Sequence, residues 1–103
     1  MDTGDLADAV RGHRVVEVRY TSGDKSETRI IHPDALYRTA AGDVRLEAVQ
    51  VGGATSGELP GWRAFELMRI VDVRVLSAVF EPAADYNPTS PRYHHGLLAS
   101  AQP

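Results

Sequence analysis

The 103-residue sequence contains no cysteine. This absence excludes a disulfide scaffold, a thiolate zinc site and a cysteine nucleophile, and it fits a reducing compartment. No run of about 18 apolar residues is present, so no membrane-spanning helix is expected. The first residues are acidic, whereas a secretory signal begins with basic residues followed by an apolar run. We therefore expect a cytoplasmic protein that does not associate with membranes.

The sequence also lacks the motifs of common catalytic sites. Gly52, Gly53 and Gly57 follow a predicted strand, but no helix or lysine–serine pair comes after them, as a phosphate-binding loop requires. No serine has a histidine and an acid in a recognisable catalytic context, and the carboxylates occur singly. His94 and His95 are adjacent but have no evident third ligand. We expect no enzymatic activity, no cofactor and no metal site.

The residues that are present describe one small globular domain. The composition is 43% hydrophobic and 24% charged, close to the average for soluble proteins. The net charge is −3, yet residues 11–75 carry ten basic and nine acidic side chains, so the acidic excess lies near the two ends. Ten of the eleven basic residues are arginine. Arginine suits carboxylate and phosphate recognition, although a GC-rich genome produces the same excess.

The spacing of apolar residues predicts one helix followed by a series of short strands. Leu6, Ala9 and Val10 recur at helical spacing between Asp5, a capping residue, and Gly12. After the helix, apolar and polar residues alternate with the period of half-buried strands. We expect strands at residues 16–21, 26–32, 35–39, 44–51, 62–67 and 70–76.

The same pattern predicts how the strands end and which way they face. Pro33 is expected to end the second strand, because proline cannot donate to the ladder. Residues 52–61 hold four glycines and form a ten-residue loop. Val71, Val73 and Val75 are expected to face inward. Five or six short strands after one helix predict a mainly β fold. We expect a small antiparallel β-barrel or a strongly bent antiparallel sheet, with the helix covering one open end.

The last part of the chain shows no sustained period. Residues 81–103 contain four of the six prolines and many small residues. Leu97 and Leu98 alone bury too little surface to order the roughly 20 residues around them. We therefore expect a folded domain at residues 1–80 and an irregular, flexible tail at residues 81–103.

Five stretches follow one another as they do in a known protein family. They are Val16–Tyr20, Ser26–Pro33, Leu36–Tyr37, Arg63–Ile70 and Phe80–Pro82. In this order they resemble a WYL domain, a bacterial ligand-sensing module with an Sm-like β-barrel that occurs in transcription regulators. The resemblance covers residues 5 to about 86, and it implies an Sm-like barrel and a sensing function.

The sequence departs from this family at the tripeptide that names it. Val44 and Arg45 stand where the family has tryptophan and tyrosine, and only Leu46 is kept. Most members also carry a DNA-binding helix-turn-helix, which does not fit in this sequence. The resemblance therefore implies a stand-alone module that acts through a regulatory protein partner.

The resemblance implies a ligand surface made of basic and polar side chains on the strands. Three converging arginines would bind an anionic small molecule, such as a nucleotide, or single-stranded nucleic acid. The competing interpretation is that each arginine is solvated or paired with an acid such as Glu27, Glu66 or Asp72. The candidate ligand-binding residues are Arg29, Arg63, Arg69, Tyr20, His32 and Arg45.

Side chains alternate between the two faces of a strand, so Arg63 shares a face with Phe65 and Leu67, which we expect in the core. Because a charged side chain cannot lie deep in that core, we expect Arg63 at the rim of the barrel. There the loop at 52–61 could act as a lid over it. Trp62 and Tyr37 could stack on a base, although packing in the core or at the rim is the favoured interpretation. His13 and His32 are interpreted as structural histidines.

Two alternatives to a sensor remain open. One is a protein-interaction or oligomerisation module that has lost ligand binding, in which a strand edge pairs with another chain as a homo-oligomer or with a partner. The other is a diverged regulator fragment that acts on a full-length paralogue.

Overall fold

The computed structural model describes residues 3–55 and 57–101. One α-helix precedes a set of strands and two short 3₁₀ turns, η1 and η2. The elements are α1 (Thr3–Arg11), β1 (Arg14–Ser22), β2 (Lys25–Arg38), β3 (Val44–Gly53), β4 (Gly61–Glu66), η1 (Leu67–Arg69), β5 (Ile70–Val79), η2 (Pro91–Tyr93) and β6 (Leu97–Ser100).

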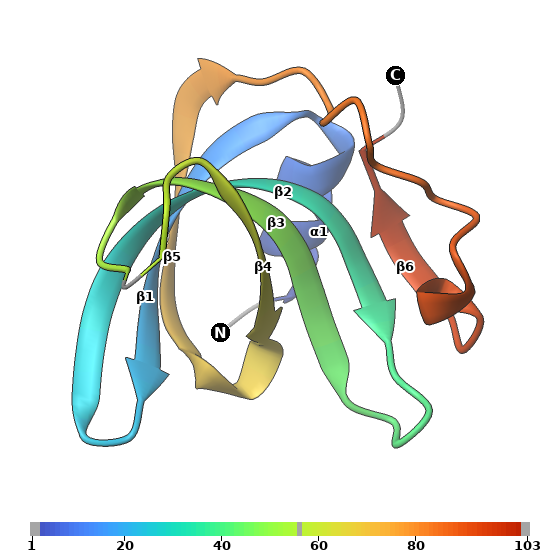
Figure 1. Ribbon diagram of the computed structural model, residues 1–103, viewed down its shortest axis with the longest axis horizontal. Coiled ribbons are helices and arrows are strands. Elements are labelled where there is room, and N and C mark those ends of the chain that lie inside the picture. The colour runs from blue at the N-terminus through green and yellow to red at the C-terminus, as the bar shows by residue number, and fades with distance from the viewer. Residues whose placement is uncertain (1–2, 56, 102–103) are drawn as a thin grey trace.

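The strands form one curved antiparallel sheet (Figure 1). Its order is β4-β3-β2-β1-β5, and β6 pairs with β2 off this path. The mainly β prediction is confirmed, but the predicted closure is not, because β4 and β5 remain the two edges of an open sheet. The η1 turn separates these two strands in sequence. A side-chain hydrogen bond links the β1 and β4 regions instead, from the Glu66 N–H to the Tyr20 hydroxyl oxygen at 3.1 Å.

The predicted end of a strand at Pro33 is wrong. β2 runs through Pro33 and joins the segments predicted as two separate strands. β2 pairs with β1 as far as Ile31 and with β6 from Ala35 onward, so Pro33 has a strand partner on the β3 side alone. The register against β3 also shifts between Pro33 and Ala35. Proline is tolerated at such a one-sided, irregular position.

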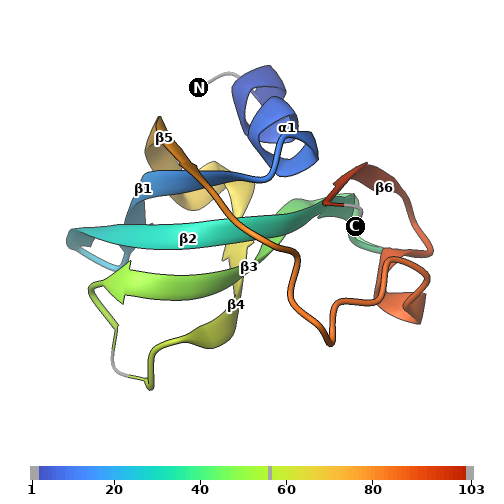
Figure 2. The same cartoon turned by 90° about the horizontal axis from the view of Figure 1, so that it is seen from above.

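The main core lies between α1 and the curved sheet. Figure 2 shows α1 beside the end of the sheet that holds β1 and β5, away from the edge strand β4. Closely packed apolar side chains fill this space, which accounts for the helical stripe read from the sequence. They include Leu6, Ala9, Val10, Val16, Val18, Ile31, Leu46 and Phe65.

The valines of β5 that were predicted to face inward are less buried than expected at two of the three positions. Val71 is 53% exposed and Val75 is 39% exposed, whereas Val73 is partly buried against the core. Because the sheet does not close against β4, the side chains expected to face a barrel interior remain at the surface. β5 is therefore an edge strand with apolar side chains exposed.

The segment after residue 80 is more regular than the sequence indicated. β6 pairs with β2 from Ala35 to Tyr37, and Tyr93 is only 7% exposed. Tyr93 packs with Ala35 and Tyr37 in a second apolar cluster. The expectation of an irregular tail is corrected here, because long β2 offers a short partner strand a place to pair. The division into a domain at 1–80 and a tail at 81–103 stays a prediction.

Within the described residues, no helix is both long enough and apolar enough to cross a membrane.

Candidate functional site

Two of the candidate arginines come together beside the loop that precedes β4. Arg29 extends from β2 and Arg63 from β4, and both line an open depression of about 580 Å³. The rest of its lining comes from the loop and from Gly61 at the start of β4. We call it the Arg29–Arg63 depression. The other lining residues are Thr55, Gly57, Glu58, Pro60 and Gly61.

Arg29 is held in place by two aromatic rings and one buried amide. Its guanidinium carbon lies 5.6 Å from the ring centroid of Tyr20 and 5.9 Å from that of Phe65. Its Nη1 donates to Gln50 Oε1 at 3.3 Å. The fully buried Gln50 is itself fixed, because its Nε2 donates to the carbonyl oxygens of Gly52 and Ala54 at 3.0 Å each. The buried Nε of Arg29 has no hydrogen-bond partner among the residues that the structure describes.

The loop before β4 wraps around the Arg63 guanidinium. Nη1 donates to the Trp62 carbonyl at 2.8 Å, and Nη2 donates to Thr55 Oγ1 at 3.2 Å and to the Glu58 carbonyl at 3.0 Å. A Cβ added at Gly57 or Gly61 would lie 2.7 Å or 2.6 Å from a guanidinium nitrogen of Arg63. The glycines of the loop therefore let its backbone approach the arginine closely. The structure places Arg63 beside this loop, as the strand period suggested.

Arg45 and Arg69 lie in a second depression, of about 350 Å³, together with Tyr20 and Glu66. Arg69 Nε is 2.6 Å from Glu66 Oε2, so its charge is balanced. Within residues 3–55 and 57–101, the buried Nε of Arg45 has no hydrogen-bond partner. Tyr20 connects the two depressions, since its ring packs against the Arg29 guanidinium. The candidate arginines thus form two pairs with one tyrosine between them, where the sequence predicted a single cluster.

The candidate arginines differ from one another in whether a carboxylate balances their charge. Of the candidate site arginines, only Arg69 forms an ion pair in the part of the chain that the structure describes. Arg29, Arg45 and Arg63 have no carboxylate oxygen within 4.0 Å there. Of the competing interpretation, solvation or pairing with an acid, the pairing is seen for Arg69 alone among the described residues. Unbalanced guanidinium groups in neighbouring depressions favour an anion.

His32 lies apart from the arginines. Its ring stacks on Phe80 with a centroid distance of 4.8 Å and an interplanar angle of 10°, and burial lowers its pKa. His13 contacts the same Phe80 ring at 5.7 Å. These contacts are those of packed aromatic residues. Tyr37 is also buried, in the second apolar cluster.

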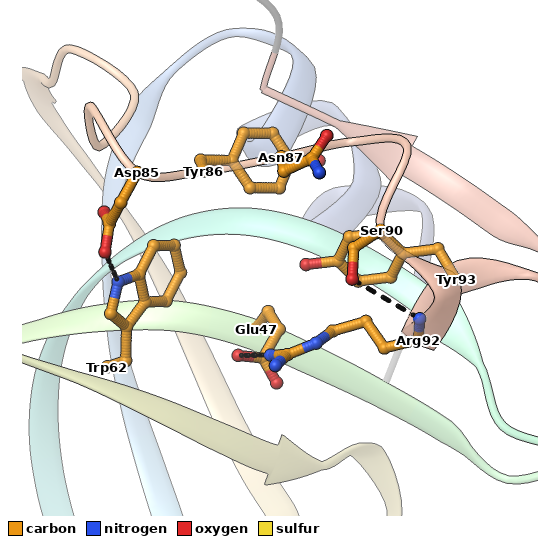
Figure 3. Close-up of a pocket in the computed structure, with 8 residues that line it drawn as sticks. All are labelled: Glu47, Trp62, Asp85, Tyr86, Asn87, Ser90, Arg92 and Tyr93. Atoms are coloured by element: carbon orange, nitrogen blue, oxygen red, sulfur yellow. Dashed lines mark hydrogen bonds and ion pairs between the residues drawn. The ribbon is translucent and has the colours of Figure 1, made fainter.

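A further pocket, of about 290 Å³, was missed by the sequence analysis. Aromatic and charged side chains of β3, β4 and the segment 85–93 surround it (Figure 3). We call it the acidic aromatic pocket. Only Trp62 drew attention in the sequence, because most of the other lining residues belong to a segment without periodicity. The lining residues are Glu47, Trp62, Asp85, Tyr86, Asn87, Ser90, Arg92 and Tyr93.

Comparisons with known proteins agree with the fold. The family model described as WYL domain matches residues 3–75. A solved structure, Proteasome accessory factor B/C (PafBC) of Arthrobacter aurescens, matches with a TM-score of 0.70 and 23% identity over 84% of this chain and 13% of that chain. At this identity the similarity shows the fold alone, and the chain spans a small part of that protein. No curated protein matches.

Proposed function

Because the chain belongs to the WYL domain family, we propose that it is a non-enzymatic sensing module that binds an anionic ligand and passes the signal to a regulatory protein. The proposed ligand is a nucleotide or a short single-stranded nucleic acid. One observation carries the proposal: Arg29 and Arg63 share a depression, and no carboxylate of the described residues forms an ion pair with either.

The chemistry of the depression suits phosphate. Each guanidinium presents donors in a planar fork, and phosphate oxygens accept several of them at once. Among the described residues nothing accepts from the buried Nε of Arg29, and an unpaired buried donor costs free energy. Arg45 lies in the neighbouring depression across Tyr20, so a ligand with successive phosphates can contact both depressions.

The test is a titration with a fluorescently labelled single-stranded oligonucleotide and with nucleotides at low salt. We expect Arg29→Gln and Arg63→Gln each to weaken binding about tenfold, because each removes one charge-assisted contact. Affinity should also fall steeply as salt is raised. Fluorescence anisotropy gives both results.

The matched control for this titration is Arg19→Gln, which removes an exposed arginine of β1 that does not line the Arg29–Arg63 depression. Absence of binding at low salt would contradict the proposal. So would equal losses in the Arg19, Arg29 and Arg63 variants. Circular dichroism shows whether each variant is folded.

A second candidate function is self-association through β5. In this edge strand, Val71, Val73 and Val75 alternate with Asp72 and Arg74. If two copies pair antiparallel about Val73, each Asp72 lies opposite Arg74 of the other copy and each Val71 opposite Val75. Such self-complementarity is what a two-fold symmetric interface requires.

Charge exchange tests this second function. We expect Arg74→Asp to abolish the dimer, because like charges then lie opposite each other. Combining it with Asp72→Arg restores the opposite-charge pairs and should restore the dimer. Sedimentation velocity measures all three proteins over a range of concentrations. A wild-type chain that stays monomeric at millimolar concentration would contradict the proposal.

A further inference from the structure

The acidic aromatic pocket lies outside both arginine depressions and differs from them in chemistry. Three aromatic rings stand around it, from Trp62 on β4 and from Tyr86 and Tyr93 in the last part of the chain (Figure 3). The ring centroids of Trp62 and Tyr86 are 6.5 Å apart, and those of Tyr86 and Tyr93 are 6.3 Å apart. Side chains distant in sequence thus surround one space of about 290 Å³.

Two carboxylates give the lining of this pocket its negative charge. Glu47 is 5% exposed, and its two oxygens accept from the Tyr37 hydroxyl at 3.2 Å and from Arg92 Nη1 at 2.9 Å. Asp85 Oδ2 accepts from the Trp62 indole N–H at 2.9 Å. Together with Arg92, these groups give the lining a formal charge of −1. The Arg29–Arg63 depression is positive by comparison, so the two sites do not favour the same ligand.

The Arg92 side chain indicates which chemistry the pocket accepts. In Figure 3 it extends across the pocket to Glu47, so a guanidinium group already occupies the Glu47 side. Its side chain is 56% exposed, whereas that of Glu47 is 7% exposed. On the other side of the pocket, the Trp62 and Tyr86 rings lie beside Asp85. Among the described residues, no cationic group lies within 4.0 Å of the Asp85 carboxylate. Aromatic faces beside a carboxylate are the setting in which organic cations bind.

We propose that the acidic aromatic pocket binds an organic cation, of the alkylated ammonium or guanidinium class, against Trp62 and Tyr86. The negative faces of the two rings attract the cation, and Asp85 balances its charge. Arg92 is a cation of the chain itself in the same pocket and opposes binding. The proposal does not depend on the anion-sensing function, because none of its residues lines the arginine depressions.

Trp62 is the only tryptophan of the chain, so its fluorescence reports directly on the pocket. The probes are choline, agmatine and 3,3-dimethyl-1-butanol, the neutral analogue in which carbon replaces the nitrogen of choline. We expect the two cations to change the Trp62 emission saturably. The neutral analogue should bind at least tenfold more weakly than choline, although its shape is nearly the same. Equal affinity for choline and the neutral analogue would overturn the proposal.

Variants locate the cation within the pocket. Asp85→Asn should weaken choline binding at least fivefold, whereas Glu81→Gln, an exposed acid that does not line the pocket, should leave it unchanged. Arg92→Gln should strengthen choline binding at least threefold, because it removes the competing cation and changes the formal charge of the lining from −1 to −2. Unchanged binding in the Asp85 variant, or weaker binding in the Arg92 variant, would overturn the proposal.

Discussion

Replacing Asp34 by asparagine is expected to raise the free energy of unfolding by up to about 4 kcal/mol at pH 8. Asp34 is fully buried on β2, beneath the last part of the chain. Burial raises the pKa of its carboxyl from 3.8 to about 7, and the charges of Asp85 and Glu47 add to the increase, against the backbone amide of Ala83. Above pH 7 the folded protein must therefore hold a carboxylate in an unfavourable place.

The sign of the pH dependence follows from the two pKa values. The unfolded chain loses the Asp34 proton near pH 3.8 and the folded chain near pH 7. Between these values the folded state binds the proton more tightly. The contribution of Asp34 to stability is therefore most favourable below about pH 4, declines as the pH rises to 7, and is constant above that.

Urea denaturation at pH 4, 6 and 8 measures this effect. The stability gain of Asp34→Asn over the wild type should be under about 1 kcal/mol at pH 4 and should reach its full size by pH 8. The control is Asp24→Asn, which changes an exposed carboxylate in the β1–β2 turn and should have little effect. A gain that is equal at all three pH values would show that burial of charge is not its cause.

The Gly53→Ala substitution is expected to lower the free energy of unfolding by about 3 kcal/mol. Gly53 ends β3 with φ +84°, where L side chains are strained. A Cβ there would lie 2.4 Å from the Thr28 carbonyl oxygen and 2.7 Å from Arg29 Cα. Both contacts are with backbone, so β2 must move away, and the backbone of Arg29 moves with it.

Gly42→Ala is the matched control for this clash. Gly42 has φ +92°, but nothing lies within 4 Å of an added Cβ. Its substitution therefore costs the conformational strain alone, about 1–2 kcal/mol. Denaturation of the two variants isolates the contact with β2. Equal losses would show that β2 accommodates the added atom without cost.

The helix and the strands could be predicted because local periodicity follows from burial on one side. Leu6 and Val10 mark the buried stripe of α1, and the alternation in residues 44–51 marks β3. The pairing of strands and the closure of the sheet could not be predicted in the same way. Whether Pro33 ends a strand depends on which neighbours pair there, and those neighbours come from distant parts of the chain. Closure of the sheet likewise depends on edges that no local pattern describes.

The candidate site was predictable to a similar degree. The resemblance to a family selected Arg29 and Arg63, which line one depression, but it also selected His32, which packs against Phe80. Gln50 was missed because an isolated glutamine in a strand carries no signal before its partners are known. The acidic aromatic pocket was missed because residues 85–93 supply most of its lining.

The pleat of β4 places two neighbouring side chains back to back. Trp62 lines the acidic aromatic pocket, whereas Arg63 lines the depression beside the loop, and the Arg63 guanidinium donates to the Trp62 carbonyl. A single peptide unit therefore joins the residue that lines the proposed cation site to the residue that lines the proposed anion site. Any displacement of the guanidinium by a bound anion acts on the peptide that carries the indole. Under the two proposals, ligands of opposite charge would bind on either side of one peptide bond.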